Sequence, residues 1–232
     1  MGLDVVPREV RLRVLRILLE PATKGIGFKI GKTRISGYDY ETIAILMYLG
    51  EVTLAYGNLT DMKDSGGVAY YQGSSVDGAS NVLYLPRSYK ESYLSLDARS
   101  VVVHEATHAA LDHRRRALRK LDSEMLAYFA QFWYGMAKGF DYTLADREIG
   151  KMSAIVGYGT DCVRQYQANG GKIDEQNLEG FRNAIKAMPL YGDADRKTSP
   201  GDGITYLSTT DPLFRAGILS EILAPGGLLD PP

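Results

Sequence analysis

Two of the three histidines in this chain, His104 and His108, lie four residues apart within an apolar segment. The spacing of apolar residues predicts a helix from Asp97, as its N-cap, to about residue 120. On a helix, positions four apart differ by about 40° around the axis and by about 6 Å along it, so the two imidazoles share one face. Two imidazoles placed in this way can bind one tetrahedral Zn²⁺ ion at about 2.0–2.1 Å each.

Glu105 follows the first histidine directly and completes an H-E-x-x-H pattern. It lies about 100° around the helix from that histidine, beside the ligand face rather than on it. A carboxylate there can reach a zinc-bound water and take its proton while the metal lowers the pKa of that water. The pattern therefore assigns Glu105 the role of general base.

A zinc site of this kind needs a third protein ligand and an open position for water. His113 points about 180° away from the first histidine, and Asp112 lies about 12 Å along the axis from it. Cys162 fits a core position better than a ligand position. The best candidate is Glu124, which follows His108 by 124 − 108 = 16 residues. A second helix is predicted for about residues 122–138, and it can run antiparallel to the first, which would bring Glu124 back to the two histidines. The alternative role for Glu124 is compensation of the dipole of that helix.

Two segments carry a family resemblance: His104-Glu105-Ala106-Thr107-His108 and Ser123-Glu124-Met125-Leu126-Ala127-Tyr128. Together they resemble the zincin metallopeptidases, in particular the gluzincin branch, over roughly residues 80–138. The resemblance implies that His104, His108 and Glu124 bind zinc and that Glu105 is the general base. It also implies that residues 82–85 form an edge strand along which an extended peptide substrate docks.

The chain departs from the gluzincin pattern at two points. In many gluzincins an aspartate lies four residues after the glutamate ligand and orients a ligand histidine. This chain has Tyr128 at that position, and Asp112 is a possible substitute for the aspartate. Family members also often use a downstream histidine to stabilise the oxyanion, and none follows His113. A tyrosine or arginine must then take that role. The tyrosine candidates are Tyr158, Tyr166, Tyr191 and Tyr206.

The order of predicted elements indicates an α+β fold, and the resemblance implies that this fold is zincin-like. We expect a small mixed or antiparallel sheet whose edge strand, 82–85, packs on the motif helix and the glutamate helix, followed by a mainly helical C-terminal part. Residues 8–19 fit both the helical and the strand period in part, so both interpretations stay open. The other predicted elements are a hairpin at 25–36, a helix at 40–56, a strand at 68–71, and helices at 144–168, 174–188 and 212–223. We expect a metal-binding core at 1–140, a helical subdomain at 141–223 that completes the cleft, and a frayed tail at 224–232.

Composition excludes several other classes of protein. Lys and Arg total 27 against 28 Asp and Glu, without the basic excess of a dedicated nucleic-acid binder. The single cysteine cannot form an intrachain disulfide. No signal peptide or membrane-spanning apolar run is present, so the expected location is the cytoplasm by default and no membrane partner is expected; signal-independent secretion would leave no such sequence signal. Gly31-Lys32-Thr33 lacks the preceding glycine of a phosphate-binding loop.

The sequence thus predicts a zinc-dependent metallohydrolase, with a metallopeptidase acting on peptides or proteins as the first interpretation. Two alternatives stay open. One is a zincin-like binding or regulatory module without peptidase activity, favoured by Tyr128 and by the missing downstream histidine. The other is a zinc hydrolase of a non-peptide amide, because the same activated water can attack any such carbonyl.

Overall fold

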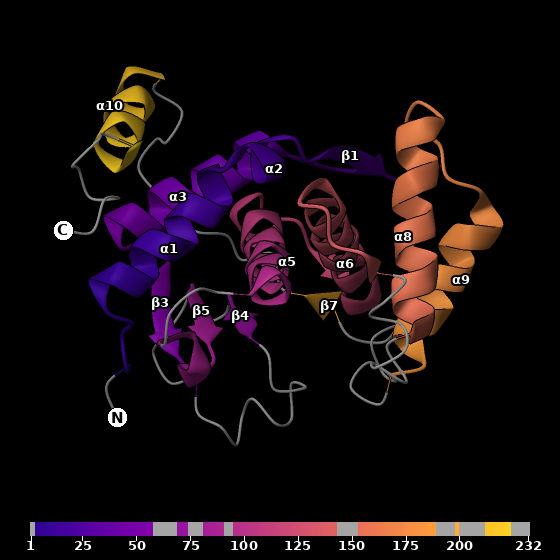
Figure 1. The fold of residues 1–232 in the computed structure, drawn as a ribbon, viewed down its shortest axis with the longest axis horizontal. Coiled ribbons are helices and arrows are strands. Elements are labelled where there is room, and N and C mark those ends of the chain that lie inside the picture. Colours follow the sequence, from indigo (N-terminus) through magenta and orange to yellow (C-terminus); the bar gives the residue numbers. More distant parts are fainter. Residues whose placement is uncertain are drawn as a thin grey trace.

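The computed structural model describes residues 3–57, 69–73, 81–90, 95–142, 153–188, 198–199 and 212–223. They form an α+β arrangement that is mostly helical, with small sheets (Figure 1). In chain order the elements are α1 Arg8–Leu19, α2 Pro21–Lys24, β1 Gly27–Ile30, β2 Thr33–Ser36, α3 Gly37–Leu49, β3 Thr53–Tyr56, β4 Tyr70–Gln72, β5 Val82–Leu85, the 3₁₀ helix η1 Arg87–Lys90, α5 Leu96–His113, β6 Leu118–Arg119, α6 Lys120–Ala137, α8 Ser153–Ala168, α9 Glu175–Lys186, β7 Thr198–Ser199 and α10 Pro212–Leu223.

Residues 8–19, whose apolar pattern suits both helix and strand, form helix α1. Val10, Val14 and Leu18 recur every four residues along it and are almost completely buried. Helices α1 and α3 pack against each other, and each also packs against α5, the helix that carries the H-E-x-x-H motif. One side of the motif helix is therefore covered by the N-terminal part of the chain (Figure 1).

The helix predicted for residues 40–56 is shorter than expected, because α3 ends at Leu49. Gly50 follows with φ +83°, and its N–H bonds to carbonyls of the last helical turn. Glycine adopts this left-handed conformation at little cost, which makes it a common helix terminator. Leu54 fits the helical spacing in the sequence, but it lies in strand β3.

The three-stranded sheet has the order β3-β5-β4. β5 pairs in parallel with β3, where Thr53 lies opposite Val82, and antiparallel with β4. The prediction that residues 82–85 form an edge strand is therefore wrong, since this strand is central. The cause is the early end of α3: once Gly50 terminates that helix, residues 53–56 become a strand that covers one side of β5.

The motif helix and the glutamate helix are neighbours near the middle of the molecule (Figure 1). Ser95, rather than Asp97, caps α5, because its hydroxyl accepts a hydrogen bond from the Ala98 N–H at 3.2 Å. α5 ends at His113, earlier than expected, and Arg115 in the following turn has φ +51°. This turn brings the chain back along α5, as the antiparallel arrangement requires.

The hairpin predicted for residues 25–36 is confirmed as β1 and β2. Its buried Phe28 packs on Phe129 of α6, with ring centroids 4.6 Å apart, and also contacts Trp133. The Lys29 N–H donates to the Tyr166 hydroxyl of α8 at 2.8 Å. The hairpin therefore packs against both α6 and α8, and the aromatic residues of α6 belong to the hydrophobic core or pack against it.

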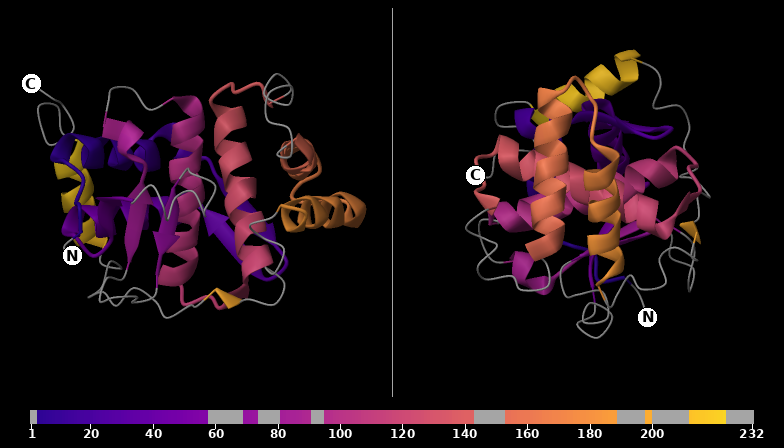
Figure 2. Two further views of the ribbon diagram at one scale, coloured as in Figure 1. Left: turned by 90° about the horizontal axis from the view of Figure 1, so that it is seen from below. Right: turned by 90° about the vertical axis from the view of Figure 1, so that its right-hand side faces the viewer.

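The C-terminal helices lie at two ends of the molecule (Figure 2). α8 and α9 pack together and against α6, whereas α10 packs against α3 at the far end. The division of the chain near residue 140 stays a prediction. The expected tail, 224–232, lies outside the described residues, as does the start of the helix predicted from residue 144.

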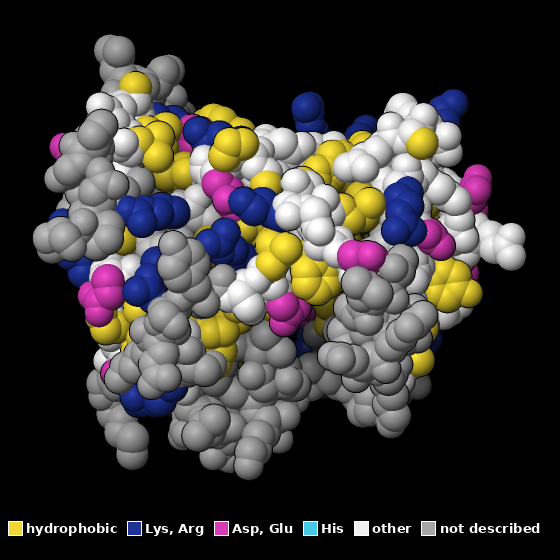
Figure 3. Space-filling model, in the orientation of Figure 1, with side chains coloured by type: hydrophobic (Ala, Val, Ile, Leu, Met, Phe, Trp, Pro, Cys, Tyr) yellow, Lys and Arg dark blue, Asp and Glu magenta, His cyan; other side chains and the backbone are white. Residues whose placement is uncertain are grey.

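Basic and acidic side chains lie interspersed on the face drawn in Figure 3, in keeping with the nearly balanced charge of the chain. Each helix that the structure describes is too short or too polar to span a lipid bilayer.

Candidate metal centre

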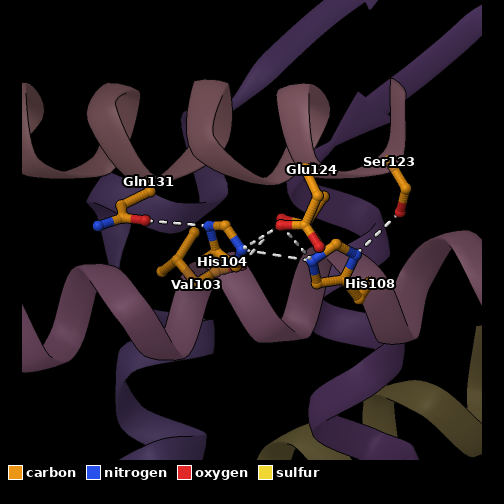
Figure 4. A network of polar contacts seen from close by, with 7 residues as sticks. Val103, His104, His108, Ser123, Glu124 and Gln131 are labelled. Carbon is orange, nitrogen blue, oxygen red and sulfur yellow. Dashed lines mark hydrogen bonds and ion pairs between the residues drawn. The ribbon is translucent and has the colours of Figure 1, made fainter. Parts of the chain in front are cut away.

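His104, His108 and Glu124 converge between α5 and α6 (Figure 4). The Nε2 atoms of the two histidines are 3.3 Å apart. Oε2 of Glu124 lies 3.4 Å from Nε2 of His104 and 3.6 Å from Nε2 of His108. Among the described residues, these three form the group of His, Cys, Asp and Glu side chains that can share one ion. The three side chains that the sequence predicted as ligands are thus brought together.

The three ligand atoms form a nearly equilateral triangle of the size that a tetrahedral zinc ion requires. Two ligand atoms at about 2.0–2.1 Å from zinc, at the tetrahedral angle, are about 3.3–3.4 Å apart. Charge-assisted hydrogen bonds are shorter, at about 2.7–2.9 Å. Oε2 of Glu124 is buried and has no hydrogen-bond partner. A buried carboxylate oxygen without a hydrogen bond is costly, and a cation bound by these three atoms would stabilise its charge.

The packing of the two helices explains this convergence. His104 and His108 stand one turn apart on α5, and Glu124 lies in the second turn of α6, after the chain has reversed direction. Ala127, one turn further along α6, is fully buried, as expected for a small residue where helices pack closely. The convergence of these three side chains therefore follows from one helical repeat and one antiparallel return of the chain.

Charge interactions and burial shift the pKa values of several side chains at this site. Burial would raise the pKa of Glu124, but His108 and His104 outweigh it and hold this pKa well below its usual range. Burial alone would lower the pKa of His108, yet the Glu124 carboxylate raises it. Burial raises the pKa of Glu105, the predicted general base. The site thus combines an ionised carboxylate with a second carboxyl group whose affinity for a proton is increased.

The outer nitrogens of both histidines are held by side chains of α6. Nδ1 of His104 is 3.0 Å from Oε1 of Gln131, and Nδ1 of His108 is 2.9 Å from Oγ of Ser123. Figure 4 shows both contacts pointing away from the ligand triangle. These partners were not predicted from the sequence, although Ser123 directly precedes Glu124 and Gln131 follows it by 131 − 124 = 7 residues, two helical turns.

Asp112, which the sequence offered as the histidine partner, has a different contact. Its buried Oδ2 accepts a hydrogen bond from the Tyr71 hydroxyl of β4 at 2.8 Å. The backbone of Tyr71 also forms a hydrogen bond with Glu105. Tyr71 thus connects β4 to two carboxylates of α5, seven residues apart. Gly73 permits this approach, because a Cβ atom there would lie 2.6 Å from Oδ2 of Asp112.

We expect Tyr71→Phe to lower the free energy of unfolding by about 1–3 kcal/mol, because the buried Asp112 carboxylate loses a hydrogen-bond donor. Urea unfolding followed by circular dichroism measures the change. Tyr158→Phe is the control: Tyr158 is 42% exposed, so losing its hydroxyl should change stability by less than about 0.5 kcal/mol. Equal stability of the two variants would show that the Tyr71 hydroxyl does not anchor β4.

Other residues singled out in the sequence lie elsewhere. His113 ends α5, outside the ligand group. Cys162 is fully buried, and burial raises the pKa of its thiol to about 12, as expected for a core cysteine. Tyr166 binds the hairpin, and Tyr158 packs on Gly180 of α9. The two remaining candidates for oxyanion stabilisation, Tyr191 and Tyr206, lie outside the described residues.

Comparisons with protein-family models, with curated proteins and with solved structures find no match to this chain. A possible metal site is therefore supported by the geometry of His104, His108 and Glu124 alone.

Proposed function

We propose that this protein is a zinc-dependent metallohydrolase, and more specifically a metallopeptidase of the zincin type that cleaves peptide bonds with Glu105 as general base. One observation carries the proposal. A buried carboxylate oxygen of Glu124, which accepts no hydrogen bond, forms a triangle with two imidazole nitrogens of an H-E-x-x-H helix, and this triangle has the size expected around tetrahedral zinc.

His104, His108 and Glu124 would hold the zinc ion through Nε2, Nε2 and Oε2. When bound there, zinc would lower the pKa of a water molecule in its open position and polarise a carbonyl. Glu105 would accept the proton of the attacking water and deliver it to the leaving amine. Its raised pKa suits this exchange, because a general base works best with a pKa closer to neutral.

The resemblance to gluzincins favours a peptide over other amides. Strand 82–85 does not add to this support, because it is paired on both sides. The histidine partners differ from the gluzincin pattern as well. Tyr128 packs its ring edge-on against His104, with centroids 4.5 Å apart, and the hydrogen-bonding role passes to Gln131.

Zinc titration of the metal-stripped protein, in competition with a chromogenic chelator, tests the site. We expect one equivalent to bind to the wild type and to His113→Ala, which removes the histidine outside the site, and none to bind tightly to His108→Ala. Cleavage of a peptide library should then be lost on chelation and restored by zinc.

The results separate the three interpretations of the sequence. A wild-type protein that binds no zinc would overturn the proposal altogether. Zinc binding without cleavage of any peptide would indicate a binding module, and cleavage confined to non-peptide amides would indicate another amide hydrolase.

A further inference from the structure

Both ligand histidines use their second ring nitrogen to contact an uncharged side chain of α6. We infer that Gln131 and Ser123 are positioning residues that select the histidine tautomers and surround the ligands with neutral rather than anionic partners. This inference rests on the proposed zinc site and extends it to the residues that control how tightly the ion is held.

The tautomer of His104 follows from the chemistry of its partner. Nδ1 lies 3.0 Å from Oε1 of Gln131, and an amide oxygen can only accept a hydrogen bond. With this orientation of the amide, Nδ1 donates to Gln131 and carries the proton. A neutral imidazole has one proton on its ring nitrogens, so Nε2 keeps a lone pair that a zinc ion shared with Glu124 would accept. The contact is buried on both sides, which strengthens the preference.

The same argument applies to His108 in a weaker form. Its Nδ1 lies 2.9 Å from Oγ of Ser123, and a hydroxyl can donate or accept. When Nε2 of His108 serves as a ligand, Nδ1 carries the proton and the Ser123 hydroxyl accepts. Gln131 therefore imposes a tautomer, whereas Ser123 adapts to one.

The neutral charge of these partners distinguishes the site. A carboxylate hydrogen-bonded to a ligand histidine raises the basicity of that ligand and strengthens metal binding. Here Tyr128 stands where a gluzincin places that carboxylate, and its ring packs on His104 instead. Asp112, the other candidate, is engaged by Tyr71. The described hydrogen bonds of the two Nδ1 atoms go to the uncharged side chains of Gln131 and Ser123.

The tautomers can be read directly. Long-range ¹H–¹⁵N spectra of the metal-free protein, at a pH where the rings are neutral, should show three histidines, and His113→Ala identifies one signal. We expect His104 to carry its proton on Nδ1 in the wild type and to lose this preference in Gln131→Met. A wild-type His104 protonated on Nε2 would overturn the inference, because Gln131 would then act as a donor.

Zinc affinity provides the second measurement, by chelator competition. Gln131→Met should weaken binding by about 10- to 100-fold, and Gln131→Glu should tighten it, because it supplies the carboxylate that the site lacks. Ser123→Ala should weaken binding less than Gln131→Met does. Gln167→Met makes the same chemical change at an exposed position of α8 and should leave affinity unchanged.

The outcomes distinguish this inference from the proposed function. If the wild type binds no zinc, the metal site itself is refuted. If the wild type binds zinc but both Gln131 variants stay within about twofold of it, the site stands and the role of Gln131 is wrong. Gln131→Glu retains the shape of the side chain and an acceptor oxygen, so it tests the inference even where the methionine variant does not fold.

Discussion

Glu124→Gln is expected to lower the zinc affinity of the protein by more than about 100-fold. Loss of a residue that only hydrogen-bonds to a metal ligand typically lowers metal affinity by about 10- to 100-fold, so the expected effect is larger. The substitution keeps the shape of the side chain but removes the anion, and zinc prefers carboxylate, imidazole or thiolate ligands to a neutral amide. Glu124 supplies the oxygen that stands 3.4 and 3.6 Å from the two imidazole nitrogens. Without that charge, two neutral imidazoles alone would hold the ion.

The measurement is chelator competition, with circular dichroism to verify that the helices are intact. Asp122→Asn is the matched control, because Asp122 lies on the same helix but pairs with Arg119 at 2.7 Å, outside the ligand group. It should bind zinc as the wild type does. Unchanged affinity in Glu124→Gln would remove Glu124 from the ligand set and leave its carboxylate only the role of compensating the helix dipole.

Glu105→Gln is expected to bind zinc as tightly as the wild type, yet to lower kcat/KM for any cleaved peptide by about 10²–10⁴-fold. The amide can still accept the backbone hydrogen bond from Tyr71, so the local structure is kept. It cannot take up a proton, which is the step assigned to this residue.

Glu51→Gln, at an exposed position beyond α3, is the control for the loss of one carboxylate. It should retain full activity. A Glu105→Gln variant with wild-type kcat/KM would contradict the assignment of Glu105 as general base. Loss of zinc from this variant would instead give Glu105 a part in holding the ion.

The convergence of His104, His108 and Glu124 could be predicted from the sequence because it depends on short-range geometry. His104 and His108 share a helix face by the 3.6-residue repeat alone, whatever surrounds that helix. Glu124 required one further assumption, that the next helix returns antiparallel, and the short connection after α5 makes this the simplest arrangement. The hairpin at 25–36 was equally local, since its strands are consecutive and pair with each other.

Two errors in the predicted fold share one cause. The apolar spacing of residues 40–56 suits a helix throughout, and periodicity takes no account of Gly50, whose left-handed conformation ends α3. The strand that follows then pairs with residues 82–85, so the predicted edge strand becomes the central one. Strand order depends on which distant segments meet, and a local pattern carries no such information.

Three side chains that can bind an ion, and the carboxylate beside them, can be identified from the amino-acid sequence alone, because helical spacing is a property of neighbouring residues. The groups that support these side chains depend on how the helices and strands pack. The rotation of α6 against α5 directs Gln131 and Ser123 to the imidazoles, and the approach of β4 engages Asp112 with Tyr71. Hydrogen bonds of this kind depend on distances of a few tenths of an ångström between separate elements, which only the packed core sets.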